Sequence, residues 1–165
     1  HFGNISSDSD QWVAPARLYV GHWRHPMHAH GEPVLCQVVI DAAEPRLVAA
    51  QVAEHGVARE ADRRMLHTLD KVLRAQDVYD KPSAWGFTPC TVLPAWVRPT
   101  FSESQIEELQ RIQGYLIEAP EHKVDTVLEV RDAFLQGIGV TDRHMCRAVR
   151  EGGRYLPKNG RSTVN

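Results

Sequence analysis

Residues 33–42 (PVLCQVVIDA) form an apolar run of strand length that is rich in valine and isoleucine. Polar residues hardly interrupt it, whereas a strand with one face in water would alternate polar and apolar residues. The run therefore predicts a strand that is buried on both faces. Whatever fold the chain adopts has to cover both sides of this segment.

Three other segments bear on the sheet. Residues 16–23 (ARLYVGHW) fit a short strand that ends near Gly21, while residues 46–56 (RLVAAQVAEHG) are compatible with either a strand or a helix. The proline-rich segment 80–101 has prolines at four positions, which exclude a helix and permit only short extended pieces or edge strands. Its aromatic residues predict that it packs on the core, and these are Trp85, Phe87 and Trp96.

Four helices are expected. Residues 59–79 have an amphipathic pattern, and a second helix begins at Ser102, where Gln105 three residues later makes a capping box. Pro120 ends this second helix, and a third is expected over residues 123–136. A fourth is expected from Thr141, as N-cap, to Gly152.

Strands thus come first and helices last, with one helix between the strand regions. This order predicts an α+β fold, with a small, mostly antiparallel sheet from the N-terminal half and the proline-rich middle. About four helices would pack against it, the last three of them consecutive. We expect a single globular domain over residues 12–152, with a C-terminal helical part at 101–152, a flexible arm at 1–11 and a basic flexible tail at 153–165.

The composition restricts the functional class. Charged residues make up 24% of the 165 residues and the formal net charge is −2, so there is no global attraction to nucleic acid or membrane. Three widely spaced cysteines without a CxxC pair argue against a disulfide framework and for a reducing compartment. No apolar run has membrane-spanning length, and no signal peptide is evident. We therefore expect a soluble, cytoplasmic protein without a membrane partner.

Charge is segregated in the last third of the chain. Residues 101–140 hold eight acidic and three basic side chains, a balance of −5, whereas residues 141–165 hold six basic and two acidic ones, a balance of +4. Arg143, Arg147 and Arg150 have the spacing i, i+4 and i+7, which places them on one face of the fourth helix. Guanidinium groups match phosphate oxygens, so this face is a candidate contact for nucleic acid.

Residues 126–153 (TVLEVRDAFLQGIGVTDRHMCRAVREGG) resemble a bacterial helix-turn-helix, with a helix, a glycine-containing turn and a second helix whose exposed face is basic. The resemblance implies that Arg143, His144, Arg147 and Arg150 face a nucleic-acid groove. The tail adds three further cations, Arg154, Lys158 and Arg161. Two alternatives stay open: the same arginines form salt bridges with the acidic helix before them, or they bind an acidic protein partner.

Residues 21–32 (GHWRHPMHAHGE) contain four histidines. In an extended segment His28 and His30 point the same way, and Glu32 is a further ligand or orients an imidazole, so these three residues form a candidate metal site with zinc as its ion. A bound zinc ion with an open position would activate water for hydrolysis. The alternatives are a histidine that acts as acid or base without metal, and a loop whose imidazoles bond to backbone or water.

These patterns give three functional hypotheses. The first is a non-catalytic binding or regulatory protein that engages nucleic acid or a nucleoprotein partner through the basic C-terminal helix and tail. The second is a metal- or histidine-dependent hydrolase centred on residues 22–32. The third is a protein-binding inhibitor or adaptor that uses the acidic helix faces. The first hypothesis is preferred because it accounts for the charge segregation. No cofactor other than zinc is expected.

Overall fold

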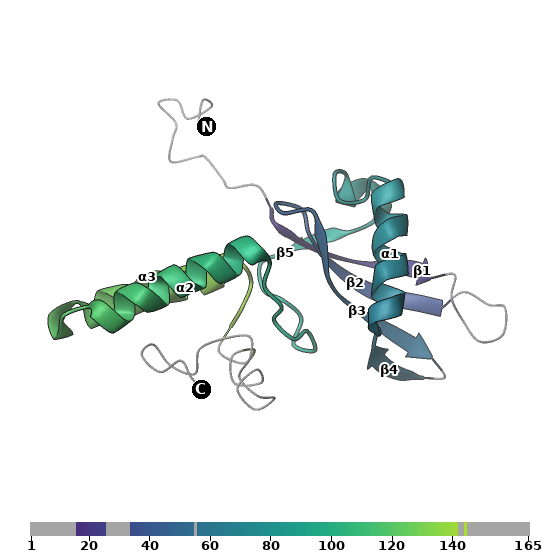
Figure 1. Ribbon diagram of the computed structural model, residues 1–165. Helices are drawn as coiled ribbons and strands as arrows, with labels where there is room; N and C mark the ends of the chain where they lie inside the picture. Colours follow the sequence, from purple (N-terminus) through teal and green to yellow (C-terminus); the bar gives the residue numbers. More distant parts are fainter. Residues whose placement is uncertain (1–15, 26–33, 55, 142–143, 145–165) are drawn as a thin grey trace, which may run out of the picture.

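The computed structural model of the chain describes residues 16–25, 34–54, 56–141 and 144 (Figure 1). In these residues the chain forms five strands and three α-helices, with two short 3₁₀ helices. The strands are β1 Leu18–His25, β2 Val34–Asp41, β3 Arg46–Glu54, β4 Val57–Glu60 and β5 Thr88–Cys90. The helices are α1 Arg63–Ala75, η2 Pro82–Trp85, α2 Glu103–Glu118, η3 Glu121–Lys123 and α3 Val124–Gly137.

The strands form one antiparallel sheet in the order β4-β3-β2-β1-β5. The predicted α+β fold is therefore confirmed, as is the origin of the sheet in the N-terminal half and the proline-rich middle. The ambiguous segment is strand β3, which pairs with β2 along most of its length. Strand β4 was not predicted, because all four of its residues are exposed and carry no apolar alternation.

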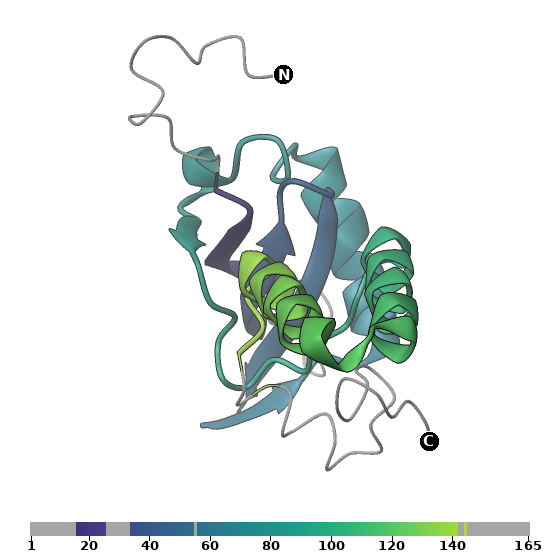
Figure 2. The same ribbon diagram turned by 90° about the vertical axis from the view of Figure 1, so that its left-hand side faces the viewer.

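Strand β2 lies in the middle of the sheet, and its second half is buried on both faces, as its sequence predicts. Val38 and Ile40 belong to a core cluster that also contains Leu69 and Leu73 of α1. Val39 points to the opposite side and belongs to a second cluster, with residues from the proline-rich segment, α2 and α3. Helix α1 thus covers one face of the sheet, and the C-terminal half of the chain covers part of the other (Figures 1 and 2).

Helix α1 is shorter than the predicted span of 59–79. Residues 57–60 pair with β3 instead, and Asp62 caps the helix by accepting a hydrogen bond from the Met65 backbone N–H at 2.8 Å. The helix ends at Ala75, and Asp77 adopts a left-handed backbone conformation with φ of 58°. Competition from strand pairing at one end and a sharp turn at the other therefore limits the helix.

Helices α2 and α3 form a hairpin that extends away from the sheet (Figures 1 and 2). The predicted capping box is present: the Ser102 hydroxyl accepts from the Gln105 backbone, and the Gln105 side chain accepts from the Ser102 backbone. Leu109, Ile112 and Leu116 are buried, whereas Ile106 is 42% exposed.

The prediction of about four helices, the last three consecutive, is off by one. Three α-helices occur in the described residues, and only α2 and α3 are consecutive. The fourth predicted helix, from Thr141 to Gly152, falls almost wholly outside the described residues, as do the predicted arm at 1–11 and tail at 153–165. Among the described residues, no helix is long and apolar enough to cross a membrane.

Two glycines allow side chains to approach the backbone closely. A Cβ atom on Gly21 in β1 would lie 2.5 Å from the Phe87 ring, so the bare backbone makes room for that ring. Gly139 has φ of +82°, and a Cβ atom there would lie 2.4 Å from Leu18 Cδ1. Gly139 also accepts a hydrogen bond from the Leu93 backbone N–H at 2.9 Å, which returns the chain to the sheet after α3.

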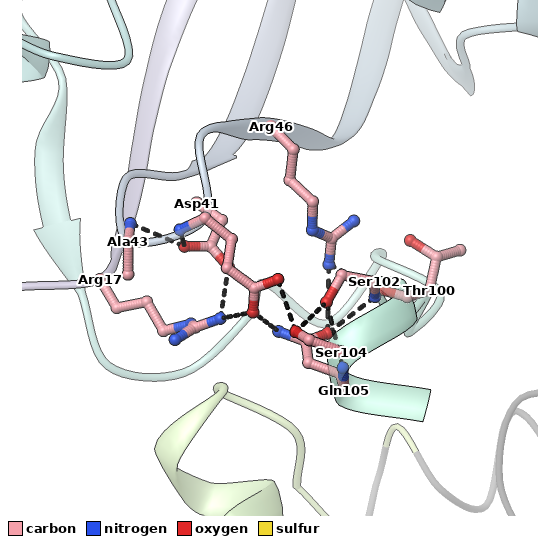
Figure 3. Close-up of polar contacts among 9 residues, drawn as sticks. Arg17, Asp41, Ala43, Arg46, Thr100, Ser102, Ser104 and Gln105 are labelled. Carbon is pink, nitrogen blue, oxygen red and sulfur yellow. Dashed lines mark hydrogen bonds and ion pairs between the residues drawn. The ribbon is translucent and has the colours of Figure 1, made fainter. Parts of the chain in front are cut away.

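A polar cluster joins the turn between β2 and β3 to the start of α2 (Figure 3). Arg17 forms ion pairs with buried Asp41 at 2.9 Å and with Glu44 at 2.7 Å, and Glu44 accepts a hydrogen bond from the Ser104 hydroxyl at 2.8 Å. Arg46 donates to the Thr100 carbonyl oxygen at 3.0 Å. The cluster fixes the first turn of the hairpin to the sheet.

Candidate nucleic-acid interface

Most residues predicted to form a site lie outside the described part of the chain. For the nucleic-acid contact these are Arg143, Arg147, Arg150, Arg154, Lys158 and Arg161. For the metal site they are His28, His30 and Glu32. The exception is His144.

His144 is only 1% exposed, so its ring does not face a groove on the surface. The Thr141 backbone N–H donates to its Nδ1 at 3.0 Å, which makes Nδ1 an acceptor. The neutral ring therefore carries its proton on Nε2, which donates to the Pro94 carbonyl oxygen at 3.1 Å. His144 thus attaches the start of the basic C-terminal segment to the proline-rich segment, and we leave it out of the proposed contact surface.

The first half of the helix-turn-helix resemblance has a counterpart in the structure. Helix α3 provides a first helix, and Gly139 provides the turn. Leu135 points inward and is buried, whereas Ala133 is exposed. The second helix of the resembled unit falls outside the described residues, so the residues that would read a groove remain a prediction.

The described residues offer no metal centre or activated thiol. No group of three or more His, Cys, Asp and Glu side chains among them could hold a metal ion. His22 is exposed on β1, opposite Gln37. Burial raises the pKa of the thiols of Cys36 and Cys90, which disfavours the thiolate needed for nucleophilic attack.

Helix α1 presents a basic surface that was not predicted from the sequence. It carries Arg63, Arg64, Lys71 and Arg74, with Asp70 as its one acidic residue. Arg74 is held by Asp70, with Nε 3.0 Å from Oδ2. The other three cations form no ion pair with any residue that the structure describes.

Asp70 is occupied by two partners. Besides Arg74, it accepts a hydrogen bond from the Tyr79 hydroxyl at 2.5 Å, and the Arg74 guanidinium lies 4.9 Å from the centre of the Tyr79 ring. Burial, together with this hydrogen bond, raises the pKa of Tyr79 well above its ordinary value. The one acidic side chain of α1 is thus engaged within the protein and does not cancel the charge of the remaining cations.

The charged residues of α1 divide between two flanks. Arg63, His67 and Arg74 line a groove of about 320 Å³ between α1 and the start of β3. Arg64 and Lys71 are seven residues apart, so they align on the helix, and they do not line this groove. Both side chains are exposed.

Two tryptophans meet on the same face of the sheet as α1. Trp23 of β1 is paired with Cys36, packs against the core cluster of α1, and lies 5.4 Å from Trp85 of η2 between ring centroids. The planes of the two rings are tilted by 51°. Trp85 is 42% exposed, so one side of the pair is open to solvent.

Helix α1 thus carries exposed cations, and an exposed indole, that of Trp85, lies beside Trp23. Cations can contact phosphate groups, and an exposed indole can stack on a base. The sequence shows the spacing of Arg64 and Lys71, but it cannot show that Trp23 and Trp85, 62 residues apart, lie together. The aromatic content of the proline-rich segment predicts only that Trp85 packs on the core, whereas its side chain is 42% exposed.

Comparisons of the chain with protein-family models, with curated proteins and with solved structures found no match. The arrangement of the side chains is therefore the basis for assigning a function.

Proposed function

We propose that this protein is a non-catalytic binding protein that engages nucleic acid, free or in a nucleoprotein complex, through basic side chains of α1 and of the C-terminal segment. The observation that carries the proposal is the group of exposed cations on α1 that form no ion pair with a described residue: Arg63, Arg64 and Lys71. Exposed cations of this kind contact phosphate groups and release the counterions condensed on the nucleic acid. Binding then falls steeply as salt rises.

The C-terminal segment provides the second proposed contact. Arg143 lies between the anchor residues Thr141 and His144, and the other cations come after them in the sequence: Arg147, Arg150, Arg154, Lys158 and Arg161. The anchor supports the proposal because it ties His144, near the start of this basic segment, to Pro94. In the competing explanation these cations pair with the acidic hairpin, and then their loss would not affect nucleic-acid binding.

The test is a binding measurement with single-stranded and duplex DNA at about 50 mM and about 200 mM salt. We expect the wild type to bind at low salt and to lose affinity at high salt. Arg64→Ala/Lys71→Ala should weaken binding and reduce the salt dependence, since each lost phosphate contact lowers the slope by about one.

A matched control removes the same charge elsewhere. Arg111 and Lys123 lie in the acidic hairpin region, so Arg111→Ala/Lys123→Ala changes the net charge equally without altering α1. This control should bind as the wild type does. Absence of binding at low salt, or equal loss in both double variants, would overturn the contact by α1. Arg147→Ala/Arg150→Ala tests the C-terminal contact in the same assay.

The α2–α3 hairpin favours protein binding as a second candidate function. Tyr115, Ile117 and Val130 are each more than half exposed on helices that also carry most of the acidic surplus. Large exposed apolar residues within a charged surface are typical of protein contacts. A basic protein partner captured by the wild type and lost with Tyr115→Ser/Ile117→Ser would support this function, and capture that is unchanged in the variant would refute it.

A further inference from the structure

The groove of about 320 Å³ between α1 and the start of β3 is partly apolar. Helix α1 packs against this strand on one face of the sheet (Figure 1). Leu66 of α1 and Leu47 of β3 line the groove, and both also pack against the core cluster on that face. Small-ligand sites usually have volumes of about 300–1,000 Å³, so the groove has room for a small molecule or for one end of a longer one.

Two polar side chains of α1 are available to a ligand in this groove. Arg63 and His67 both line it, both are exposed, and neither forms a hydrogen bond or ion pair with a residue that the structure describes. They are four residues apart on the helix, a spacing that brings Cβ atoms to about 5–6 Å from each other. One anionic group can therefore contact the guanidinium of Arg63 and the ring of His67 at the same time.

The other charged side chains of the groove are engaged within the protein. Arg74 donates to Asp70 Oδ2 at 3.0 Å and to the Pro45 carbonyl oxygen at 2.9 Å. Arg46 donates to the Thr100 carbonyl oxygen at 3.0 Å, so its guanidinium is directed toward the start of α2. Of the three arginines that line the groove, Arg63 is thus the one without a described partner.

From this arrangement we propose that the groove binds a phosphomonoester, with the phosphate on Arg63 and His67 and the rest of the molecule against Leu47 and Leu66. A phosphomonoester carries about −1.5 to −2 charges at neutral pH and has three terminal oxygens that accept hydrogen bonds. The planar guanidinium matches two of these oxygens and leaves one for the imidazole. A phosphodiester has one negative charge and one terminal oxygen fewer. This site lies beyond the proposed function, because it needs no nucleic-acid strand.

The first measurement is a calorimetric titration of the full chain with thymidine 5′-monophosphate and with thymidine, at about 50 mM salt. The monophosphate should bind at least about tenfold more tightly, because thymidine lacks the charged group. Arg63→Gln should lower the affinity for the monophosphate by about tenfold, and His67→Gln should weaken it as well. In NMR spectra the ring signals of His67 should shift with the monophosphate and stay in place with thymidine.

Arg111→Gln is the matched control, because it makes the same exchange at an exposed arginine of α2 that does not line the groove. It should bind the monophosphate as the wild type does. Circular dichroism and thermal unfolding of each variant separate loss of binding from loss of folding. Equal loss in folded Arg63→Gln and Arg111→Gln proteins would show that net charge, and not the groove, attracts the ligand, and would overturn the site.

A second measurement distinguishes two sources of a phosphomonoester, a free small molecule and the end of a nucleic-acid strand. It compares a single-stranded oligodeoxythymidine that carries a 5′-phosphate with the same strand ending in a 5′-hydroxyl. Tighter binding of the phosphorylated strand that is lost in Arg63→Gln identifies the strand end as a ligand. Equal binding of the two strands, together with binding of the monophosphate, identifies a small molecule.

Failure of this site and failure of the proposed function give different results. If the 5′-hydroxyl strand binds at low salt but a terminal phosphate strengthens the binding of neither thymidine nor the strand, the proposed function stands and the phosphate site is overturned. A terminal phosphate whose effect is the same in the wild type and in Arg63→Gln also overturns it. If the monophosphate binds in a way that depends on Arg63 and no strand binds, the site is supported and the proposed function fails.

Discussion

His144 donates a hydrogen bond from its ring Nε2 to the carbonyl oxygen of Pro94, 3.1 Å away and 50 residues earlier in the chain. The ring is buried, and its other nitrogen accepts from Thr141. His144 thus connects the proline-rich segment to the end of the described fold through its two hydrogen bonds. Its removal would leave buried polar groups without partners.

We predict that His144→Ala lowers the free energy of unfolding by about 1–3 kcal/mol, the usual cost of leaving a buried hydrogen-bonding group unsatisfied. Urea unfolding followed by circular dichroism measures it. His67→Ala is the matched control, since His67 is exposed on α1, and its effect should stay within about 0.5 kcal/mol. Unchanged stability of His144→Ala would show that this contact contributes nothing.

Gly21→Ala should destabilise the protein by about 1–3 kcal/mol, because the added methyl group would overlap the Phe87 ring. Gly114→Ala, in α2, has open space around its Cβ and should instead stabilise by about 0.5–1 kcal/mol through helix propensity. Thermal unfolding of the two variants gives opposite shifts. Shifts of the same sign would contradict the packing of Phe87 on β1.

The contribution of Glu44 should depend on pH. Burial alone would raise the pKa of its carboxyl, but hydrogen bonds from Ser102 and Ser104 and the charge of Arg17 outweigh burial and hold the pKa below its ordinary value. A carboxyl with a lowered pKa stabilises the fold above the pKa of the unfolded chain and loses that effect as pH falls through the folded value.

The measurement compares unfolding of the wild type and Glu44→Gln from pH 7 to pH 3. The wild type should be more stable by about 0.2–1 kcal/mol near pH 7, a modest amount because the side chain is 34% exposed. The difference should shrink below about pH 4.3, the ordinary value for glutamate. A difference that is constant with pH would show that charge is not its origin.

Tyr79 should stay protonated in the folded protein at alkaline pH. Burial and the hydrogen bond to Asp70 raise its pKa, so its stabilising effect is present below the ordinary tyrosine value and is lost only as pH rises toward the folded value. In an ultraviolet titration of the folded protein, Tyr79→Phe and the wild type should therefore show the same amplitude. A smaller amplitude in the variant would mean that Tyr79 ionises before unfolding.

The elements that could be predicted are those whose local sequence is compatible with only one type of secondary structure. The unbroken apolar run of β2 and the capping box of α2 are of this kind, and both are present. Strand β4 could not be predicted, because it gains its structure only from the neighbouring edge of β3. The extent of α1 was overestimated for the same reason, since strand pairing takes over residues that also suit a helix.

The candidate site could not be predicted, because it depends on contacts between residues that are far apart in the sequence. The C-terminal arginines, which the charge segregation indicates, lie outside the described residues, and His144, which the helix-turn-helix resemblance implies, is buried. The cations of α1 were visible in the sequence, but their lack of partners depends on the positions of Asp70 and Tyr79. The contact of Trp23 with Trp85 depends on how η2 folds back over β1, which no local pattern encodes.

The α2–α3 hairpin is attached to the rest of the fold at both of its chain ends. At the start of α2 the attachment is the polar cluster around Arg17 and Glu44. After α3 it is the hydrogen bond from the Leu93 backbone N–H to the Gly139 carbonyl oxygen. Helix α2 has 16 residues and is about 24 Å long, so the far end of the hairpin lies well away from these attachments. Tyr115 lies near the far end of α2, whereas Leu109 of α2 and Leu135 of α3 pack in the core cluster of Val39, so the apolar contact of the hairpin with β2 is made at its inner end.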